Sequence, residues 1–144
     1  SRMGLINDLV YICAPSPLQY GVSAAFEMDD AYFDDLLDRY TAKRTLMCET
    51  LEACGFAFAW PEGAYYVLAD FERLARQRPG FEDDRAACDT LIREAGVAAV
   101  PGNSFFADPE DGRYVLRFCY AKRMEVLEEA CRKLRAAFGQ AVEA

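Results

Sequence analysis

Hydrophobic positions recur at helical spacing over most of the chain. A stripe from Phe33 to Cys54 has a period close to 3.6 residues and predicts one long helix of about 24 residues. Asp29 or Asp30 can cap its start, and Gly55 follows its end. Shorter stripes or capping residues predict further helices at residues 17–27, 70–75, 84–95 and 122–138.

Four other segments are rich in aromatic, apolar or β-branched residues and predict strands, at residues 56–60, 64–69, 97–100 and 113–120. Ser16 and Gln19 have the spacing of a capping box at the start of the helix at 17–27. Residues 5–14 are apolar without a clear period. This order predicts an α+β two-layer domain, in which helices cover a small, mostly antiparallel sheet. A connecting helix and the long helix precede the sheet.

The composition is that of a folded domain. Of the 144 residues, 53% are hydrophobic and 28% charged, and no apolar run approaches the ~20 residues of a membrane span. The net charge of −8 opposes binding to phosphate backbones. We therefore expect neither nucleic acid nor a membrane as a partner.

The chain has no histidine, which excludes imidazole acid–base chemistry and histidine–metal sites. Its six cysteines show no Cys-x-x-Cys spacing, and four occupy apolar positions of predicted helices: Cys48, Cys54, Cys88 and Cys131. Small buried thiols in a reducing cytoplasm, with no metal site, explain this pattern, and a disulfide or a zinc site is the alternative.

Arg117 lies in the middle of the predicted strand at 113–120, between Val115 and Cys119. An arginine there is costly unless it is paired, and its planar fork suits a carboxylate. The pattern leaves two interpretations, an outer face that meets water or a site for the carboxylate of a ligand.

The loop before this strand, VPGNSFF at 100–106, is a second candidate. Gly102 permits close backbone approach, and Asn103 and Ser104 can bond to neighbouring backbone or to a ligand. A plain loop is the alternative, because the segment lacks the pattern of a phosphate-binding loop.

Seven segments occur in the order and at the spacing found in one enzyme family: APSPLQ at 14–19, YTAKR at 40–44, LEACGF at 51–56, PEGAYY at 61–66, EAGV at 94–97, VPGNSF at 100–105 and YVLRF at 114–118. The chain thereby resembles the C-terminal part of a class I/II aminotransferase. These enzymes depend on pyridoxal 5′-phosphate (PLP) and have the aspartate aminotransferase fold.

The resemblance implies roles for four residues. Arg117 matches the arginine that holds the α-carboxylate of the substrate, and Asn103 lies in the loop that precedes it. Gly63 and Ala64 match a turn near the substrate entrance and are expected to touch substrate. The partners would be an amino acid and a 2-oxo acid.

The resemblance also implies what this chain lacks. The lysine that binds PLP and most other cofactor ligands lie earlier in the family, so we expect no catalytic or cofactor-binding residue here. Residues 1–28 would end the large domain with a connecting helix, and residues 29–144 would form the small domain. Alone, the chain would not transaminate and would tend to self-associate, whereas the complete enzyme would be a homodimer.

Three other interpretations stay open. A PLP-dependent C–S lyase has the same small domain. An aminotransferase-like domain can sense ligands within a regulator. The chain can also be an unrelated α+β domain in which Arg117 is solvated.

Overall fold

A computed structural model describes residues 2–11 and 13–139. The chain divides into two compact units, residues 1–37 and 38–144, and each is considered by itself. In the described part, no helix has the length and apolar character needed to cross a membrane.

The first unit is helical. It contains α1 (Arg2–Val10), α2 (Ser16–Ala25) and the beginning of α3 (Asp30–Ala53), and none of the residues of α1 or α2 is buried. The prediction of a capping box at the start of α2 is wrong: no side chain caps this helix, and the Gln19 amide donates to the Ala14 carbonyl at 2.6 Å. Helix α1 was not anticipated from the sequence.

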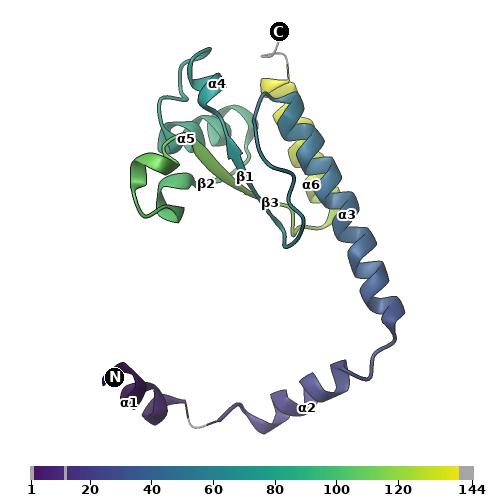
Figure 1. The fold of residues 1–144 in the computed structure, drawn as a ribbon. Coiled ribbons are helices and arrows are strands. Elements are labelled where there is room, and N and C mark those ends of the chain that lie inside the picture. Colours follow the sequence, from purple (N-terminus) through teal and green to yellow (C-terminus); the bar gives the residue numbers. More distant parts are fainter. Residues whose placement is uncertain (1, 12, 140–144) are drawn as a thin grey trace. The chain divides into compact units, whose positions relative to one another are not determined.

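The second unit contains a three-stranded antiparallel sheet with the strand order β1-β3-β2 (Figure 1). The strands are β1 (Tyr66–Asp70), β2 (Val100–Pro101) and β3 (Val115–Cys119). The central strand β3 pairs Arg117 with Leu68 on one side and with Val100 on the other.

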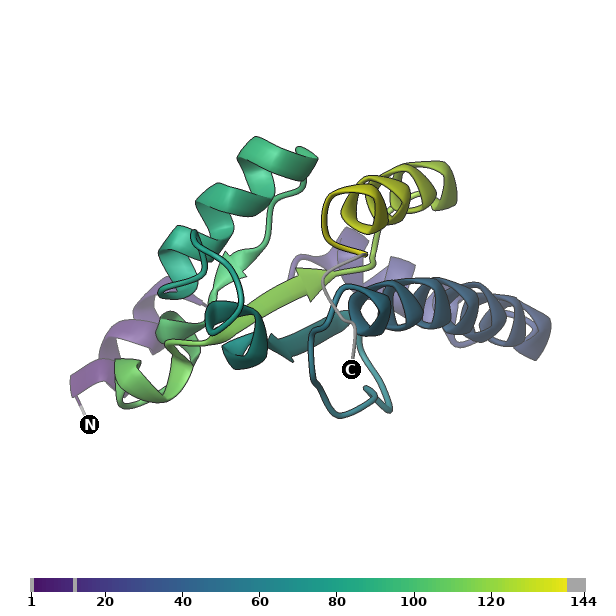
Figure 2. The ribbon, with the colours of Figure 1, turned by 90° about the horizontal axis from the view of Figure 1, so that it is seen from above.

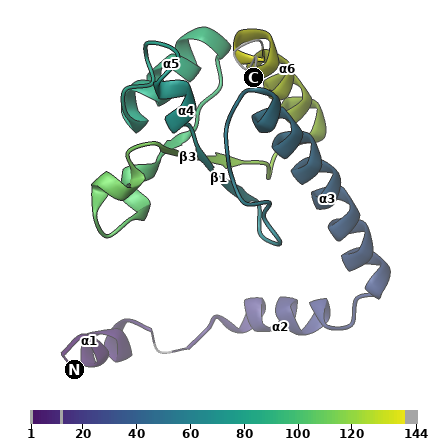
Figure 3. The same cartoon turned by 45° about the horizontal axis from the view of Figure 1, so that its top comes forward.

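Helices cover one face of this sheet, as predicted for an α+β domain. Helix α3 lies beside α6 (Met124–Phe138), and α5 (Asp84–Ala95) lies next to α6 over the sheet (Figures 2 and 3). The Arg135 Nε–H of α6 donates to the Thr50 hydroxyl of α3 at 3.1 Å. The remaining short elements are α4 (Glu72–Ala75) and the 3₁₀ turns η1 (Gly102–Phe105) and η2 (Pro109–Gly112).

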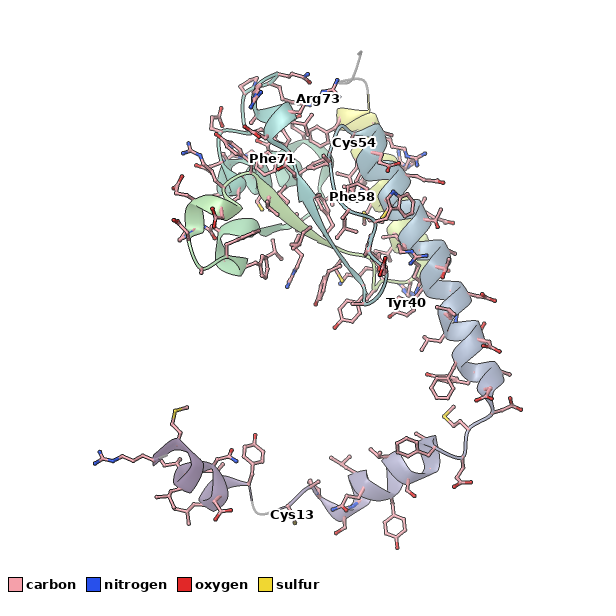
Figure 4. All side chains as sticks on the ribbon, viewed as in Figure 1. Cys13, Tyr40, Cys54, Phe58, Phe71 and Arg73 are labelled. Atoms are coloured by element: carbon pink, nitrogen blue, oxygen red, sulfur yellow. The ribbon has the colours of Figure 1, made fainter. Side chains whose placement is uncertain are left out.

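The core lies between the helices and the sheet. Alternate strand residues supply the sheet side of it, namely Val67, Ala69, Leu116 and Phe118. Aromatic rings extend it through edge-to-face contacts, for example Phe71 on Phe81 at 5.7 Å (Figure 4 labels Phe71). Strands β1 and β3 thus each have one buried face and one open face.

Several sequence predictions of helix ends are confirmed. Gly55 and Gly96 follow α3 and α5 with positive φ angles of 87° and 64°, a conformation that glycine adopts without strain. Asp83 caps α5 by accepting the backbone N–H groups of Arg85 and Ala86.

The four helical cysteines are buried, as predicted, and all six cysteines are free thiols. Loss of hydration on burial raises the pKa of Cys48, Cys54 and Cys88 to about 11. The described residues contain no cluster that could hold a metal ion.

The predicted strand at 56–60 is wrong. Only Ala57 pairs with the sheet, through a single bridge to Asp70. The segment instead packs along α3. The Trp60 indole donates to the Glu52 carboxylate at 2.9 Å, and the Arg44 guanidinium donates to the Pro61 carbonyl at 3.0 Å. Of the predicted strand at 97–100, only Val100 is paired, and it begins the two-residue strand β2.

Candidate functional site

Arg117 lies on the open face of the sheet, at its centre. Its neighbours along β3, Leu116 and Phe118, point into the core, so the alternation of the strand directs Arg117 to the opposite face. Across the sheet its partners are Leu68 and Val100, two apolar residues that are both exposed. The Arg117 guanidinium is therefore a charged group with apolar side chains on both neighbouring strands.

Two aromatic rings hold the guanidinium of Arg117. Its central carbon lies 4.2 Å from the ring centre of Tyr66 and 4.6 Å from that of Phe105. A guanidinium stacked on a ring face is attracted by the negative face of the π system. A hydrogen bond with Tyr65 raises the pKa of the Tyr66 phenol, so this ring stays neutral at physiological pH.

No acidic side chain among the described residues neutralises the guanidinium of Arg117. Its Nε is buried without a hydrogen-bond partner, and no ion pair of Arg117 exists with the described residues. An unpartnered buried donor costs about 1–3 kcal/mol, so such a group is stable only where the surrounding structure imposes it. A planar anion such as a carboxylate is the complement that this cation lacks.

The loop after β2 is packed too tightly for side chains at its glycines. A Cβ on Gly102 would clash with the backbone oxygen of Val115 and lie 2.7 Å from that of Gly112. The prediction that Gly102 allows close backbone approach is therefore confirmed. This contact sets the path of η1, which ends at Phe105.

Asn103 is bound within the fold through its backbone. Its N–H donates to the Asp84 carboxylate at 2.8 Å, and the residue lines a polar pocket of about 310 Å³ with the start of α5 and with η2. Arg117 does not line this pocket. Within the described residues, Asn103 and Arg117 are thus linked through η1 rather than through a shared cavity.

Gly63 and Ala64 lie in the exposed turn before β1. Ala64 has a positive φ of 57° and accepts a hydrogen bond from the Tyr120 hydroxyl at 3.1 Å, which ties the turn to the residue after β3. Two residues later the chain reaches Tyr66, which stacks on Arg117. The hydrogen bond to Tyr120 therefore holds the turn that leads into β1, the strand with one of the two rings that contact Arg117.

The three lysines lie apart from Arg117. Lys43 is on α3, over the ring of Tyr40 at 5.0 Å (Figure 4 labels Tyr40), and Lys133 pairs with Glu129 at 3.4 Å on α6. Lys122 precedes α6 and lines a groove of about 580 Å³ there. Lys43 and Lys133 are thus each engaged with a side chain of their own helix.

Sequence reasoning missed the groups that hold Arg117. Tyr66 lies in the predicted strand at 64–69 and Phe105 in the loop at 100–106, but the sequence did not place either ring beside Arg117. Asp84 was expected only as the first residue of the predicted helix at 84–95. The repeated aspartate at 83–84 was the available signal, because one helix start needs only one capping side chain.

Known proteins match almost the whole chain. The family model "Aminotransferase class I and II" matches residues 1–134. The chain is 30% identical over 118 residues to "Aspartate aminotransferase" of Bacillus subtilis (strain 168), covering 81% of this chain and 28% of that protein. It is 29% identical over 130 residues to "Methionine aminotransferase" of Escherichia coli (strain K12), covering 90% and 32%.

The fold agrees with these sequence matches. The solved structure of N-succinyldiaminopimelate aminotransferase from Mycobacterium tuberculosis superposes with a TM-score of 0.73 and 30% identity, covering 90% of this chain and 32% of that one. The chain therefore spans roughly a third of the length of the proteins it matches.

Proposed function

Because this chain belongs to the class I and II aminotransferase family, we propose that it is the C-terminal part of a PLP-dependent aminotransferase in which Arg117 binds the α-carboxylate of the amino acid or 2-oxo acid. The whole enzyme would move an amino group between these two substrates. PLP, when bound elsewhere in the enzyme, supplies the electron sink that the chemistry needs.

One observation carries the proposal: the Arg117 guanidinium is held between Tyr66 and Phe105 without a carboxylate of its own among the described residues. A cation that is fixed, partly desolvated and unpaired binds an anion more strongly than a mobile surface arginine, because less rotamer freedom is lost on binding. The α-carboxylate is the one anionic group that every amino acid and 2-oxo acid substrate carries.

Arg117 would act by orientation. A carboxylate held by a two-pronged contact is fixed in direction as well as in position, and this fixes the bond from its neighbouring carbon. Gly63, Ala64 and Asn103 are proposed as further substrate contacts. Their support is their place in the sequence, two or three residues before the rings that hold Arg117: Gly63 and Ala64 precede Tyr66, and Asn103 precedes Phe105.

We propose the same division of the chain as from the sequence. Residues 1–28 would end the large domain with its connecting helix, and residues 29–144 would form the small domain. Support for this comes from the second unit, which has its own core, whereas α1 and α2 bury no residue. The free thiols are consistent with a reducing compartment, and we place the enzyme in the cytoplasm.

The experiment replaces Arg117 in the complete enzyme. L-Methionine and L-methioninamide are the probes, because they differ only in the carboxylate. Arg117→Lys keeps the charge but loses the planar fork, so we expect KM for methionine to rise about 10- to 100-fold. KM for the amide should change far less.

The matched control is Arg113→Lys, at an exposed arginine that precedes the same strand and pairs with Glu110 at 3.4 Å. This control should leave both KM values unchanged. Equal losses for methionine and its amide in Arg117→Lys would overturn the assignment. Release of ammonia and thiol without a 2-oxo acid would show a lyase instead of a transaminase.

The 144-residue chain alone should not transaminate, because it spans only about a third of the length of its relatives and two of its three lysines, Lys43 and Lys133, are engaged on their own helices. Amino transfer by this chain with added PLP would refute this. The exposed apolar residues of α1 and α2 should also drive self-association of the isolated chain, which light scattering at increasing concentration would detect. In the complete enzyme, we propose a homodimer.

A further inference from the structure

The two rings that hold Arg117 are fixed in different ways. Tyr66 belongs to β1, opposite Cys119, and is therefore the diagonal neighbour of Arg117 on the same open face. The ladder between β1 and β3 sets its position. Phe105 is the last residue of η1, and no strand pairing fixes it.

Asp84 supplies a fixed point for η1. The residue is only 4% exposed, and its Oδ2 accepts the backbone N–H of Asn103, two residues before Phe105, at 2.8 Å. A buried carboxylate is costly unless it is well bonded, and a bond from a backbone N–H to an ionised acceptor is among the stronger ones.

Capping does not explain Asp84. The preceding residue, Asp83, already caps α5 by accepting the N–H groups of Arg85 and Ala86 at 3.0 and 2.8 Å. Asp84 is thus a second acid at the same helix start, and unlike Asp83 it is buried. Its hydrogen bond leads to the loop of η1 rather than back to its own helix.

The other side of η1 is closed by backbone. Gly102 approaches Gly112 and Val115 so closely that neither glycine has space for a Cβ. The Ser104 hydroxyl also donates to the Pro101 carbonyl at 3.2 Å within the turn. The bond to Asp84, the close backbone contacts of Gly102 and the bond of Ser104 all hold η1, which ends at Phe105.

We propose that Asp84 is a positioning residue that, through the Asn103 backbone, holds Phe105 against Arg117 and so clamps the guanidinium between Phe105 and Tyr66. The clamp leaves Nε buried and presents the two Nη nitrogens to a carboxylate that arrives in the plane of the guanidinium. The inference rests on the proposed function of Arg117.

The test measures the preference for L-methionine over L-methioninamide, as the ratio of their KM values, in the complete enzyme. Phe105→Leu removes the ring and keeps an apolar side chain, so the preference should fall about three- to thirtyfold. Phe106→Leu is the matched control, because Phe106 is the adjacent phenylalanine and has no contact with the guanidinium. It should keep the preference of the parent enzyme.

Two variants of Asp84 test the link. Asp84→Ala removes the acceptor and should lower the preference about as much as Phe105→Leu does. Asp84→Asn keeps an oxygen for the Asn103 N–H and should restore most of it. Asp89→Ala, at an exposed aspartate of the same helix, should change nothing. If Asp84→Ala does not fold, Asp84→Ser, which shortens the side chain that reaches the Asn103 N–H, takes its place and should also lower the preference.

The outcomes separate the two proposals. If Arg117→Lys leaves the preference unchanged, the proposed function fails. If Arg117→Lys lowers it but Phe105→Leu and Asp84→Ala do not, the positioning role alone fails. A loss that is equal for methionine and its amide would show a merely structural effect and would overturn the clamp.

Discussion

The two units of the chain are both rich in apolar residues, but among the described residues only those of the second unit form a core. In residues 1–37, large hydrophobic side chains such as Leu9 and Phe26 are more than 80% exposed. In the described residues of 38–144, apolar side chains from helices and strands meet in one buried cluster that begins at Met47 and ends at Phe138. Apolar content therefore does not itself make a core, because elements that bury each other's apolar faces are also needed.

The largest effect is expected from truncating a buried leucine of the second unit, and an exposed leucine of the first unit is the control. Leu51 of α3 is fully buried, so Leu51→Ala should lower the free energy of unfolding by about 2–5 kcal/mol. Leu18 of α2 is exposed, and Leu18→Ala should leave it within ~0.5 kcal/mol of the parent chain. Urea unfolding followed by fluorescence of Trp60, the single tryptophan, measures both. Comparable losses would show that the first unit is packed as tightly as the second.

Buried thiols should make the second unit sensitive to alkaline pH. The pKa of Cys54 is raised from 9.0 to about 11 by burial, so above pH 9 the unfolded chain loses this proton while the folded chain keeps it. Stability is therefore fully present below pH 9 and falls as pH rises through 11. For one thiol the loss is at most about 2.7 kcal/mol.

The measurement compares urea unfolding at pH 8 and pH 11 under reducing conditions. The alkaline loss should be smaller in Cys54→Ala than in the parent chain. Cys13→Ala, which changes an exposed cysteine of the first unit, should keep the full loss. An unchanged loss in Cys54→Ala would contradict the role of the buried thiol.

One methyl group added at Gly102 should destabilise the fold, because Gly102 lies against the backbone of Val115 and Gly112. Gly102→Ala places a Cβ against the backbone of Val115 and Gly112, which cannot move aside as a side chain can. We expect a destabilisation of about 1–3 kcal/mol, measured by thermal unfolding. Gly63→Ala, where a Cβ meets nothing within 4 Å, should stay within ~0.5 kcal/mol. Equal melting temperatures for the two variants would mean that η1 is not tightly packed.

The same contrast explains which elements could be predicted from the sequence. The long helix α3 and helix α5 have buried faces, and burial produces the 3.6-residue pattern that indicates a helix. Helix α1 buries nothing, so its sequence carries no such pattern. The alternation of Phe56, Phe58 and Trp60 indicated a strand. Alternation shows only that one side of a segment is apolar, not that its backbone pairs with a sheet. This segment forms a single bridge and packs along α3.

Of the side chains that meet at Arg117, only Arg117 itself was singled out from the pattern of the strand. Arg117 is conspicuous because a charge in mid-strand breaks the apolar pattern. Tyr66 and Phe105 could not be placed beside it, because strand register and loop path depend on contacts between distant segments. The sequence could not distinguish Asp84 from its neighbour Asp83, because both are aspartates that could cap α5. In the structure Asp83 caps the helix, and Asp84 accepts the Asn103 N–H.

The smallest effect is expected for Gly21→Ala, which tests whether the stability of α2 is independent of the stability of the core. Gly21 lies inside α2, and a Cβ there meets nothing within 4 Å. Gly21→Ala should favour the helical state of residues 16–25 by up to about 1 kcal/mol, because alanine loses less backbone entropy than glycine. Carbon chemical shifts at these residues would detect the gain. The urea midpoint reported by Trp60 should not change, since α2 buries no residue. A shift of that midpoint would show that α2 and the core unfold together and that the two units are one cooperative structure.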